Sequence, residues 1–316
     1  MGRKINYLRI SITDLCNLRC KYCMPKEGIC KKFHKDILRI EEIEEIVRQS
    51  VKIGIKKVRI TGGEPLIRNG IIELVKRISS IDGIEDLAMT TNGILLKKYA
   101  RDLKSAGLNR VNISIDSLDK EKYREITRGG NIEDVMAGIK AAKDFDLTPI
   151  KLNTVLIGRF NDDEIEDFVY LTQNEKIDVR FIELMPLGEA SSWAKEHFIP
   201  NTTVLDRFPN LIPLKSEDKS SPAKHYKLPG GKGKVGLINP ISSHFCSYCN
   251  RIRITSDGKI KPCLHSNYEI NIKNLIKQNY EIIDILRFAV EAKPKEHNIN
   301  NINYEPIIRN MFQIGG

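Results

Sequence analysis

Short runs of apolar and β-branched residues recur along the first part of the chain, separated by polar and glycine-containing turns. Runs of this length predict buried strands, because a strand with a covered face needs apolar side chains along it. The strands are expected at residues 8–12, 57–61, 86–89, 110–115, 150–156 and 179–184.

Between these runs, apolar residues recur three and four positions apart, which is the spacing of one face of a helix. Ile43, Ile46 and Val47 form such a face, and Gly54 follows it as a helix stop. Asn131 precedes another such pattern and is expected to be its N-cap. Helices are predicted at residues 40–51, 71–78, 95–106, 132–142 and 164–172.

The alternation of strand and helix is typical of a parallel sheet covered by helices. Six βα units are fewer than the eight that close a full barrel. We therefore predict an α/β fold, a partial, open (β/α)6 TIM-like barrel. A polar, turn-rich stretch at 216–222 and the glycines within 230–233 indicate the passage to a smaller C-terminal α+β domain. The predicted domains are residues 1–222 and 223–316.

The charge balance suggests an anionic partner. The 316 residues include 51 Lys and Arg against 41 Asp and Glu, a net charge of +10, which suits nucleic acid or a small polyphosphate. Charge is interspersed and forms no long basic run, so composition does not choose between them. The first residues show no signal-peptide pattern, and no apolar run approaches the length of a membrane span. We expect a cytoplasmic protein that does not contact membranes.

Seven cysteines form two groups, with Cys30 left over, and their spacing argues for metal binding rather than a disulfide framework. Cys16, Cys20 and Cys23 are spaced C-x3-C-x2-C directly after the first predicted strand. Three thiolates on one loop can hold three corners of a cubane iron–sulfur cluster and leave one iron open to a small molecule. Zinc is the alternative, but the first histidine after Cys23 is His34, eleven residues further on.

The second group consists of Cys246, Cys249 and Cys263, spaced C-x2-C-x13-C, and it carries the second metal centre of the C-terminal domain. It fits a second iron–sulfur cluster. Zinc is a stronger alternative here than at the first group, because His244 or His265 could supply a fourth ligand.

Several cations are placed where they could share one cavity. Arg251 and Arg253 follow the second cysteine pair, and side chains two apart on an extended segment point the same way. Arg9, Arg59 and Lys151 lie on predicted strands of the barrel. Arginine binds phosphate with two parallel hydrogen bonds. Each cation alone could be an ordinary surface residue, but together with two metal centres they favour a polyphosphate substrate.

Small and polar residues follow the predicted strands, at the end of a parallel sheet where sites usually form. Gly62-Gly63-Glu64 follows the second strand, and two glycines let the backbone approach a ligand closely. Thr90 and Ser114 lie at the ends of the next two strands. Hydroxyls at these positions suit ribose and amino-acid groups, although capping of the loops explains each of them equally well.

Taken together, these motifs resemble the radical S-adenosylmethionine (SAM) family, and within it the enzymes of molybdenum cofactor biosynthesis. The first cysteine motif, with Tyr22 before its last cysteine, is typical of the whole superfamily. The second cysteine group and the ending Ile314-Gly315-Gly316 indicate the narrower group. The resemblance spans nearly the whole chain and includes the stretches 8–14, 58–65, 112–118, 151–155, 180–185 and 245–253.

The resemblance implies two 4Fe-4S clusters and SAM as cofactors. By this match, the first cysteine group holds the SAM-binding cluster, and the second holds a cluster whose open iron contacts the guanine of GTP. The matched SAM-contacting positions are Tyr22, Gly63, Ser114 and Met185.

The positions that match GTP contacts are Arg9, Arg59, Thr90, Lys151, Arg251, Ile252 and Arg253. Four residues match positions that take part in catalysis, and the two glycines among them are expected to reach into the active site. They are Arg251, Arg253, Gly315 and Gly316.

The implied activity is that of a radical SAM lyase in the first step of molybdenum cofactor biosynthesis. SAM is split into methionine and a 5′-deoxyadenosyl radical, which takes a hydrogen atom from C3′ of GTP. C3′ then attacks C8 to give (8S)-3′,8-cyclo-7,8-dihydroguanosine 5′-triphosphate. The implied partners are an electron donor that the sequence does not identify, a downstream cyclic pyranopterin monophosphate synthase and a second copy of the chain, with no nucleic acid.

Two other functions stay open from the residues alone. One is a different radical SAM reaction, on a peptide or on RNA, although peptide-modifying relatives usually carry more C-terminal cysteines. The other is a zinc-stabilised, basic nucleic-acid-binding protein, which explains the charge and the cysteines but not the barrel pattern. Metal analysis separates them, because iron with acid-labile sulfide excludes the zinc protein.

Overall fold

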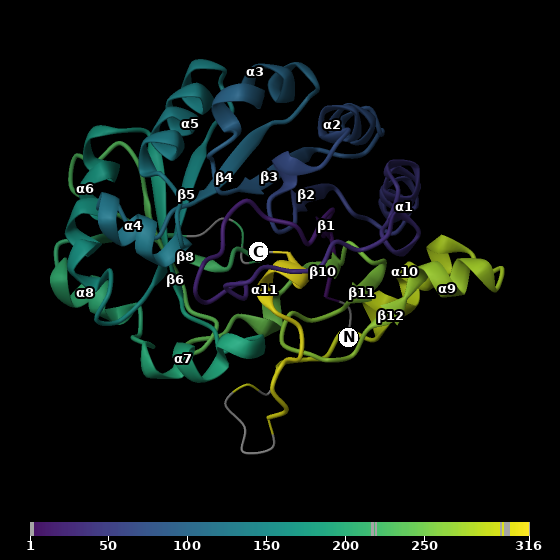
Figure 1. Cartoon of the computed structure of the whole chain (residues 1–316). Coiled ribbons are helices and arrows are strands. Elements are labelled where there is room, and N and C mark those ends of the chain that lie inside the picture. The colour runs from purple at the N-terminus through teal and green to yellow at the C-terminus, as the bar shows by residue number, and fades with distance from the viewer. Residues whose placement is uncertain (1–2, 216–217, 219, 298, 300–303, 316) are drawn as a thin grey trace.

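Six parallel strands, arranged in the order of the chain, form the inner wall of the molecule in this computed structural model (Figure 1). The structure describes residues 3–215, 218, 220–297, 299 and 304–315. Each strand pairs in parallel with the next, which confirms the predicted partial barrel. The strands are β1 (Tyr7–Ser11), β2 (Lys57–Thr61), β3 (Asp86–Thr91), β4 (Arg110–Ser114), β5 (Ile150–Leu156) and β6 (Ile177–Glu183).

Side chains alternate along these strands between the helical layer and the barrel interior. On β1, Leu8 and Ile10 are almost fully buried in the main hydrophobic core, while Arg9 between them lines a cavity. On β2, Val58 and Ile60 belong to that core, and Arg59 faces the cavity. Since successive side chains of a strand point to opposite faces, the apolar half holds the helices and the polar half is free for a ligand.

Helices cover the outer face of these strands, as Figure 1 shows. Asn131 caps one of them as predicted, because its side chain accepts a hydrogen bond from the Glu133 amide at 3.2 Å. Within the described residues, none of the helices is long and apolar enough to cross a membrane. The six helices are α1 (Ile40–Lys52), α2 (Ile71–Ser79), α3 (Leu96–Ser105), α4 (Lys120–Thr127), α5 (Ile132–Asp144) and α6 (Ile165–Asn174).

The C-terminal part of the chain extends the same sheet at both of its edges. β9 (Val235–Ile238) pairs in parallel with β6, and β10 (Arg251–Ile254) pairs in parallel with β1. The complete twelve-stranded order is β12-β11-β10-β1-β2-β3-β4-β5-β6-β9-β8-β7. The outer strands, all antiparallel to their neighbours, are β7 (Ile212–Leu214), β8 (Ala223–Lys227), β11 (Lys259–Lys261) and β12 (Ile270–Asn271).

The remaining helices are α7 (Ser191–Glu196), α8 (Thr202–Arg207), α9 (Ile272–Lys277), α10 (Ile282–Glu291) and α11 (Met311–Ile314). Of these, α11 lies inside the curve of the sheet (Figure 1). The glycines predicted to mark a passage between domains, within 230–233, turn the chain between the paired strands β8 and β9. The division into residues 1–222 and 223–316 as separate units stays a prediction.

The pairing of β10 with β1 places the two cysteine groups at opposite ends of the sheet. Cys16 follows β1, whereas Cys249 precedes β10, which runs parallel to β1. β11 returns antiparallel to β10, so Cys263, which follows β11, comes back to the end where Cys249 lies. The space inside the barrel therefore runs from one cysteine group to the other.

Candidate active site

One cavity of about 910 Å³ connects both cysteine groups. This volume lies within the range of pockets that enclose a small organic ligand. Its wall includes all six cysteines predicted to bind metal: Cys16, Cys20, Cys23, Cys246, Cys249 and Cys263.

The first cysteine loop is shaped by its own backbone. The amides of Cys23 and Met24 both donate to the Cys20 carbonyl, at 2.9 and 3.0 Å, which folds the loop into a tight turn. The Leu18 amide donates to the Cys16 sulfur at 3.4 Å. Amide hydrogens that point at sulfur stabilise thiolates bound to iron, so this loop is built to hold them.

Burial keeps these thiols neutral in the absence of metal. It raises the pKa of Cys16 to about 11 and that of Cys23 to about 12, and it raises the pKa of Cys20 well above its usual range. Metal binding requires thiolates, so assembly of a centre here releases protons. The three thiols could not stay as buried anions by themselves, and their clustering is explained by a metal centre that compensates the charge.

The compactness of the potential ligands is relevant to a single zinc ion. Ligands of one tetrahedral zinc ion lie roughly 4 Å apart or less, given Zn–S bonds of about 2.3 Å. Among the residues that the structure describes, the one group of three potential ligand atoms within 4.8 Å of one another is His244, Cys246 and His297. Among the described residues, neither complete cysteine group forms such a compact set.

Histidines gather beside the second cysteine group. The His297 ring lies 5.0 Å from that of His244 and 4.6 Å from that of His265, measured between centroids. The predicted zinc alternative named His244 and His265, and the third member, His297, was missed because it is far away in the sequence. A zinc ion on His244, Cys246 and His297 would use a sulfur that the cluster also needs, so the two centres exclude each other.

The glycine loop after β2 packs directly on the first cysteine loop. Gly63 donates to the Thr13 carbonyl at 2.7 Å, and Glu64 donates to the Leu15 carbonyl at 2.8 Å. A Cβ atom added at Gly63 would collide with the Leu15 carbonyl oxygen. This close approach explains why glycine is needed here, and it leaves backbone of the loop exposed to the cavity beside the cysteines.

The Glu64 side chain connects the glycine loop to the end of β3. Its buried carboxylate accepts hydrogen bonds from the Thr91 hydroxyl at 2.8 Å and from the Asn92 amide at 2.7 Å. Burial raises its pKa to about 7, although these bonds favour the charged form. Glu64 thus ties the ends of β2 and β3 together rather than facing a ligand.

The four predicted SAM-contacting residues line the cavity together. They come from four different segments: the first cysteine loop, the glycine loop, the end of β4 and the segment after β6. The Tyr22 hydroxyl donates to the Asp116 carboxylate at 2.7 Å, which fixes the tyrosine ring at the wall. The four residues are Tyr22, Gly63, Ser114 and Met185.

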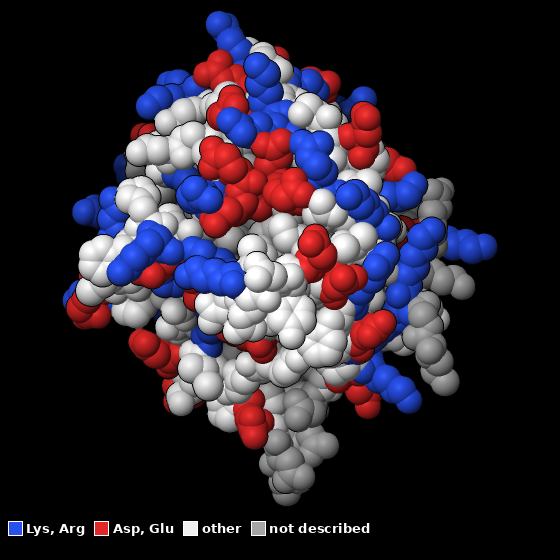
Figure 2. Space-filling model, turned by 90° about the vertical axis from the view of Figure 1, so that its right-hand side faces the viewer, with Lys and Arg blue, Asp and Glu red and all other residues white. Residues whose placement is uncertain are grey.

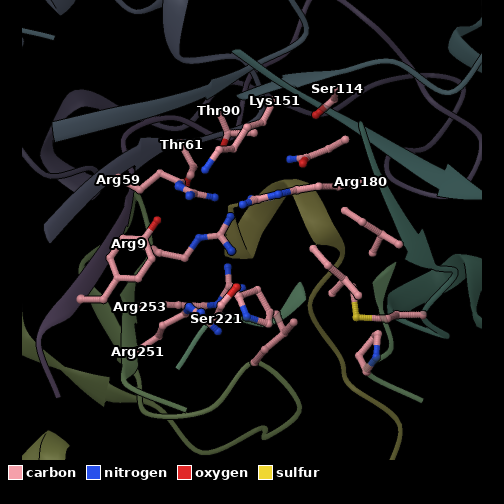
Figure 3. A pocket seen from close by; sticks show the side chains of 18 of the residues that line it. Arg9, Arg59, Thr61, Thr90, Ser114, Lys151, Arg180, Ser221, Arg251 and Arg253 are labelled. Atoms are coloured by element: carbon pink, nitrogen blue, oxygen red, sulfur yellow. The ribbon is translucent and has the colours of Figure 1, made fainter. Parts of the chain in front are cut away.

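Three arginines form a row across the sheet. Arg253 on β10 is in register with Arg9 on β1, and Arg9 is in register with Arg59 on β2. Their guanidinium groups converge in the cavity (Figure 3). Burial, together with Arg253 and Arg59, holds the pKa of Arg9 well below its usual range. Like charges on directly paired residues of neighbouring strands destabilise a sheet. The row therefore does not stabilise the fold, and it is explained by the binding of an anion.

Further cations line the cavity on the facing strands. Burial, together with the nearby Arg180, lowers the pKa of Lys151 to about 7. Arg180 on β6 was not predicted, although it is only 8% exposed and points at the arginine row (Figure 3). Its Nε, like that of Arg59, has no hydrogen-bond partner among the described residues. Its charge alone did not single it out in the sequence, because Asp178 and Glu183 are charged residues of the same strand.

The remaining predicted site residues differ in where they lie. Thr90 and Arg251 line the cavity. The Ile252 side chain is fully buried in the hydrophobic core, so only its backbone can face a ligand. The Gly315 carbonyl accepts a hydrogen bond from Arg253 at 2.7 Å, and its role in the active site stays a prediction. Gly316 lies outside the described residues.

Comparisons with known proteins place this site in a family. Residues 10–171 match the radical SAM superfamily, and residues 177–299 match the family Molybdenum Cofactor Synthesis C. A GTP 3′,8-cyclase of Alkaliphilus oremlandii is 62% identical over 316 residues, which cover 100% of this chain and 98% of that protein. The chain belongs to the GTP 3′,8-cyclase family. A second member from Alkaliphilus metalliredigens is 58% identical, over 99% of this chain and 98% of the relative.

Solved structures show the fold shared by GTP 3′,8-cyclases and other radical SAM enzymes. Streptococcus suis SuiB bound to its precursor peptide SuiA has a TM-score of 0.61 at 17% identity, covering 98% of this chain and 76% of SuiB. The enzyme anSMEcpe with bound AdoMet has a TM-score of 0.58 at 17% identity, covering 93% of this chain and 82% of anSMEcpe. At this identity the likeness concerns the fold alone.

Membership of the GTP 3′,8-cyclase family decides between the alternatives that the residues had left open. The chain is a radical SAM enzyme of molybdenum cofactor biosynthesis, with two 4Fe-4S clusters and SAM as cofactors. The zinc-stabilised nucleic-acid-binding protein is therefore excluded. The distribution of charge agrees, because both signs are interspersed on the face shown in Figure 2, whereas the cavity gathers cations.

Proposed function

We propose that this chain cyclises GTP to (8S)-3′,8-cyclo-7,8-dihydroguanosine 5′-triphosphate inside the cavity between its two cysteine groups. The observation that carries the assignment is the row formed by Arg253, Arg9 and Arg59 in the middle of that cavity. A triphosphate would balance the positive charge that this row concentrates, and arginine forks match phosphate geometry.

Cys16, Cys20 and Cys23 would hold the first cluster, and Cys246, Cys249 and Cys263 the second. When bound, SAM at the first cluster would supply the radical chemistry that removes a hydrogen atom from C3′ of GTP. Once C3′ has bonded to C8, one electron from the electron donor and one proton would complete the 7,8-dihydro ring. Tyr22, Gly63, Ser114 and Met185 would hold SAM, since they line the cavity near the first cysteine loop.

The protein itself positions the substrate and keeps water away from the reacting groups. Arg9, Arg59 and Arg253 bind the triphosphate, which fixes where the ribose lies relative to the two cysteine groups. Thr90, Lys151 and Arg251 complete the GTP site, and the Ile252 backbone is the remaining candidate contact. Holding both reactants in one geometry removes much of the entropic barrier to their reaction. The buried walls of the barrel keep water from reactive groups, as such chemistry requires.

The proposed place in metabolism comes from the family resemblance. A cyclised nucleotide must be taken onward, which is the role proposed for a cyclic pyranopterin monophosphate synthase. We further propose a cytoplasmic homodimer and a separate protein electron donor. These assignments rest on the resemblance of the sequence to its family.

The test is anaerobic turnover. Reconstituted enzyme is supplied with SAM, a reductant and one nucleoside triphosphate at a time, and 5′-deoxyadenosine is quantified. We expect release that GTP strongly stimulates and that ATP and CTP do not, together with a cyclised product that retains the triphosphate. A low release that is the same with every nucleotide would retain the radical SAM chemistry and reject GTP as the substrate.

The lowered pKa of Lys151 predicts that GTP binding depends on pH. Burial lowers its pKa to about 7, so above pH 7 it is largely neutral in the free enzyme. A bound triphosphate favours the charged amine and raises this pKa, so binding takes up a proton. Affinity for GTP should therefore fall from pH 7 to pH 9, by up to about tenfold per pH unit.

Calorimetry in two buffers of different ionisation enthalpy measures this proton uptake directly. Lys151→Met should flatten the pH profile and remove the uptake. Lys140→Met is the matched control, because Lys140 is an exposed lysine paired with Asp144 at 2.8 Å. A wild-type affinity that is constant over this pH range would show that Lys151 does not contact the triphosphate.

A further inference from the structure

The segment of residues 309–315, called the tail segment below, enters the barrel beside the arginine row. Its helix α11 places Met311 and Phe312 on the cavity wall. At its far end, Gly315 adopts φ +85°, and an added Cβ would collide with the Thr61 hydroxyl on β2. The Gly315 carbonyl accepts a hydrogen bond from Arg253. The tail segment therefore fixes one guanidinium of the proposed triphosphate site.

The near end of the tail segment is held by a second, ionic attachment. Arg309 donates to the Glu269 carboxylate at 2.6 and 2.9 Å and to the Asp257 carboxylate at 3.0 and 3.3 Å. Its side chain is only 16% exposed, and those of Asp257 and Glu269 are 20% and 19% exposed. One guanidinium thus binds two carboxylates through paired contacts, the strongest geometry for such a bond.

Both attachments are made to the same part of the sheet. Asp257 lies in the turn between β10 and β11, and Arg253 lies on β10 itself. Glu269 immediately precedes β12, which pairs with β11. The tail segment is consequently fastened at both of its ends to the strands that present Arg253 to the cavity.

The same turn also connects to the first cysteine loop. Lys32 forms an ion pair with Asp14 at 2.6 Å and lies 3.6 Å from Asp257. Asp14 is buried two residues before Cys16. The Asp257 carboxylate is thus shared between the tail segment and the loop that carries the first three cysteines.

We propose that Arg309 is a positioning residue, whose contacts with Asp257 and Glu269 hold the tail segment in the barrel and thereby set the Arg253 guanidinium for GTP. Arg309 does not line the cavity and acts only through the tail segment. The proposal rests on the proposed function, because the group that it positions belongs to the GTP site.

The first test uses Arg309→Met, which keeps the length of the side chain and removes its charge. Hydrogen exchange measured by mass spectrometry should show lost protection at residues 311–315, with protection of β1–β6 and the bound iron unchanged. Product formation from GTP should fall by about 100-fold, the size of effect that a small misplacement of a reacting partner can cause. Arg309→Lys, which keeps the charge but not the paired contacts, should give an intermediate loss.

The matched control is Arg287→Met, because Arg287 is an exposed arginine on α10 that pairs with Asp284 at 3.1 Å. It should leave exchange at residues 311–315 and product formation at the wild-type level. Unchanged exchange at these residues in Arg309→Met would overturn the proposal, whatever happens to turnover.

A double-mutant cycle shows whether Arg309 acts through the tail segment. The dissociation constant of GTP is measured for the full chain and for a chain that ends at Asn310, each with and without Arg309→Met. We expect roughly tenfold weaker binding from Arg309→Met in the full chain and no further loss in the shortened one. Equal losses in both chains would overturn the proposal. Failure of the wild-type chain to bind GTP would instead reject the proposed function, and the exchange result would still report on the tail segment.

Discussion

Replacing Cys20 with alanine is expected to abolish SAM cleavage while the chain stays folded. Cys20 is one of only three thiols on its loop, and a cubane cluster bound by two cysteines loses the site where SAM is held. We expect 5′-deoxyadenosine release to fall by more than about 100-fold, a loss that can follow even from replacing a residue that merely supports a metal ligand. Bound iron should fall by roughly half, because one of two four-iron clusters is lost.

The fold should survive because burial already raises the pKa of the Cys20 thiol well above its usual range. A neutral thiol in such a place packs like a small apolar group, and alanine replaces it without leaving a charge uncompensated. Cys30→Ala is the matched control, since Cys30 is exposed and is not part of the cavity wall. Full activity in Cys20→Ala, or an equal loss in Cys30→Ala, would contradict the assignment of the first cluster.

Replacing Arg253 with alanine is expected to impair GTP turnover strongly without lowering stability. A hydrogen bond to a charged group contributes about 1.5–3 kcal/mol, and Arg253 would bind the triphosphate as well as the Gly315 carbonyl. We therefore expect kcat/KM for GTP to fall by roughly 100-fold or more. Both clusters should still assemble, because Arg253 is not a ligand of either.

The thermal stability of the variant should not fall, because in the free enzyme the positive charge of Arg253 lies next to that of Arg9. Burial, followed by the charge of Arg251, lowers the pKa of Arg253 to about 10, which shows that its environment disfavours the cation. Removing it relieves repulsion within the arginine row. Thermal unfolding of the variant should thus begin no earlier than for wild type, and Arg287→Ala provides the exposed-arginine control. Normal turnover of GTP in Arg253→Ala would show that this residue is not a substrate ligand.

The strands and helices of the barrel could be predicted from the sequence, because each depends on the spacing of apolar residues within a short segment. Strands β2 and β5 have the predicted bounds, since a strand covered by helices on one face needs a run of apolar residues. β6 begins at Ile177, two residues before the prediction, because the half-buried Asp178 interrupts the apolar pattern. α4 was not predicted at all, although Asp119 caps it by accepting from the Lys122 amide at 2.8 Å.

The parts that were missed depend on contacts between distant residues. Nothing in residues 235–254 indicates that β9 pairs with β6 and that β10 pairs with β1. The cysteines and arginines of the site were found from their spacing and from the resemblance to a family. Arg180 needed the register of β6 beside β5, and His297 needed the folding of the chain back onto His244. Pairing of this kind is set by the whole fold and not by the neighbouring sequence.

The pairing of β10 with β1 has a consequence for how the chain is made. During synthesis β1 emerges first, yet its second neighbour is translated only after all of β2 to β9. Until then β1 is an open strand edge, and contacts over such long sequence separations form slowly. The nascent barrel therefore keeps one strand edge unpaired until β10 has been synthesised. Such an edge is prone to aggregation, so we expect chaperones that bind the nascent chain to increase the yield of folded protein.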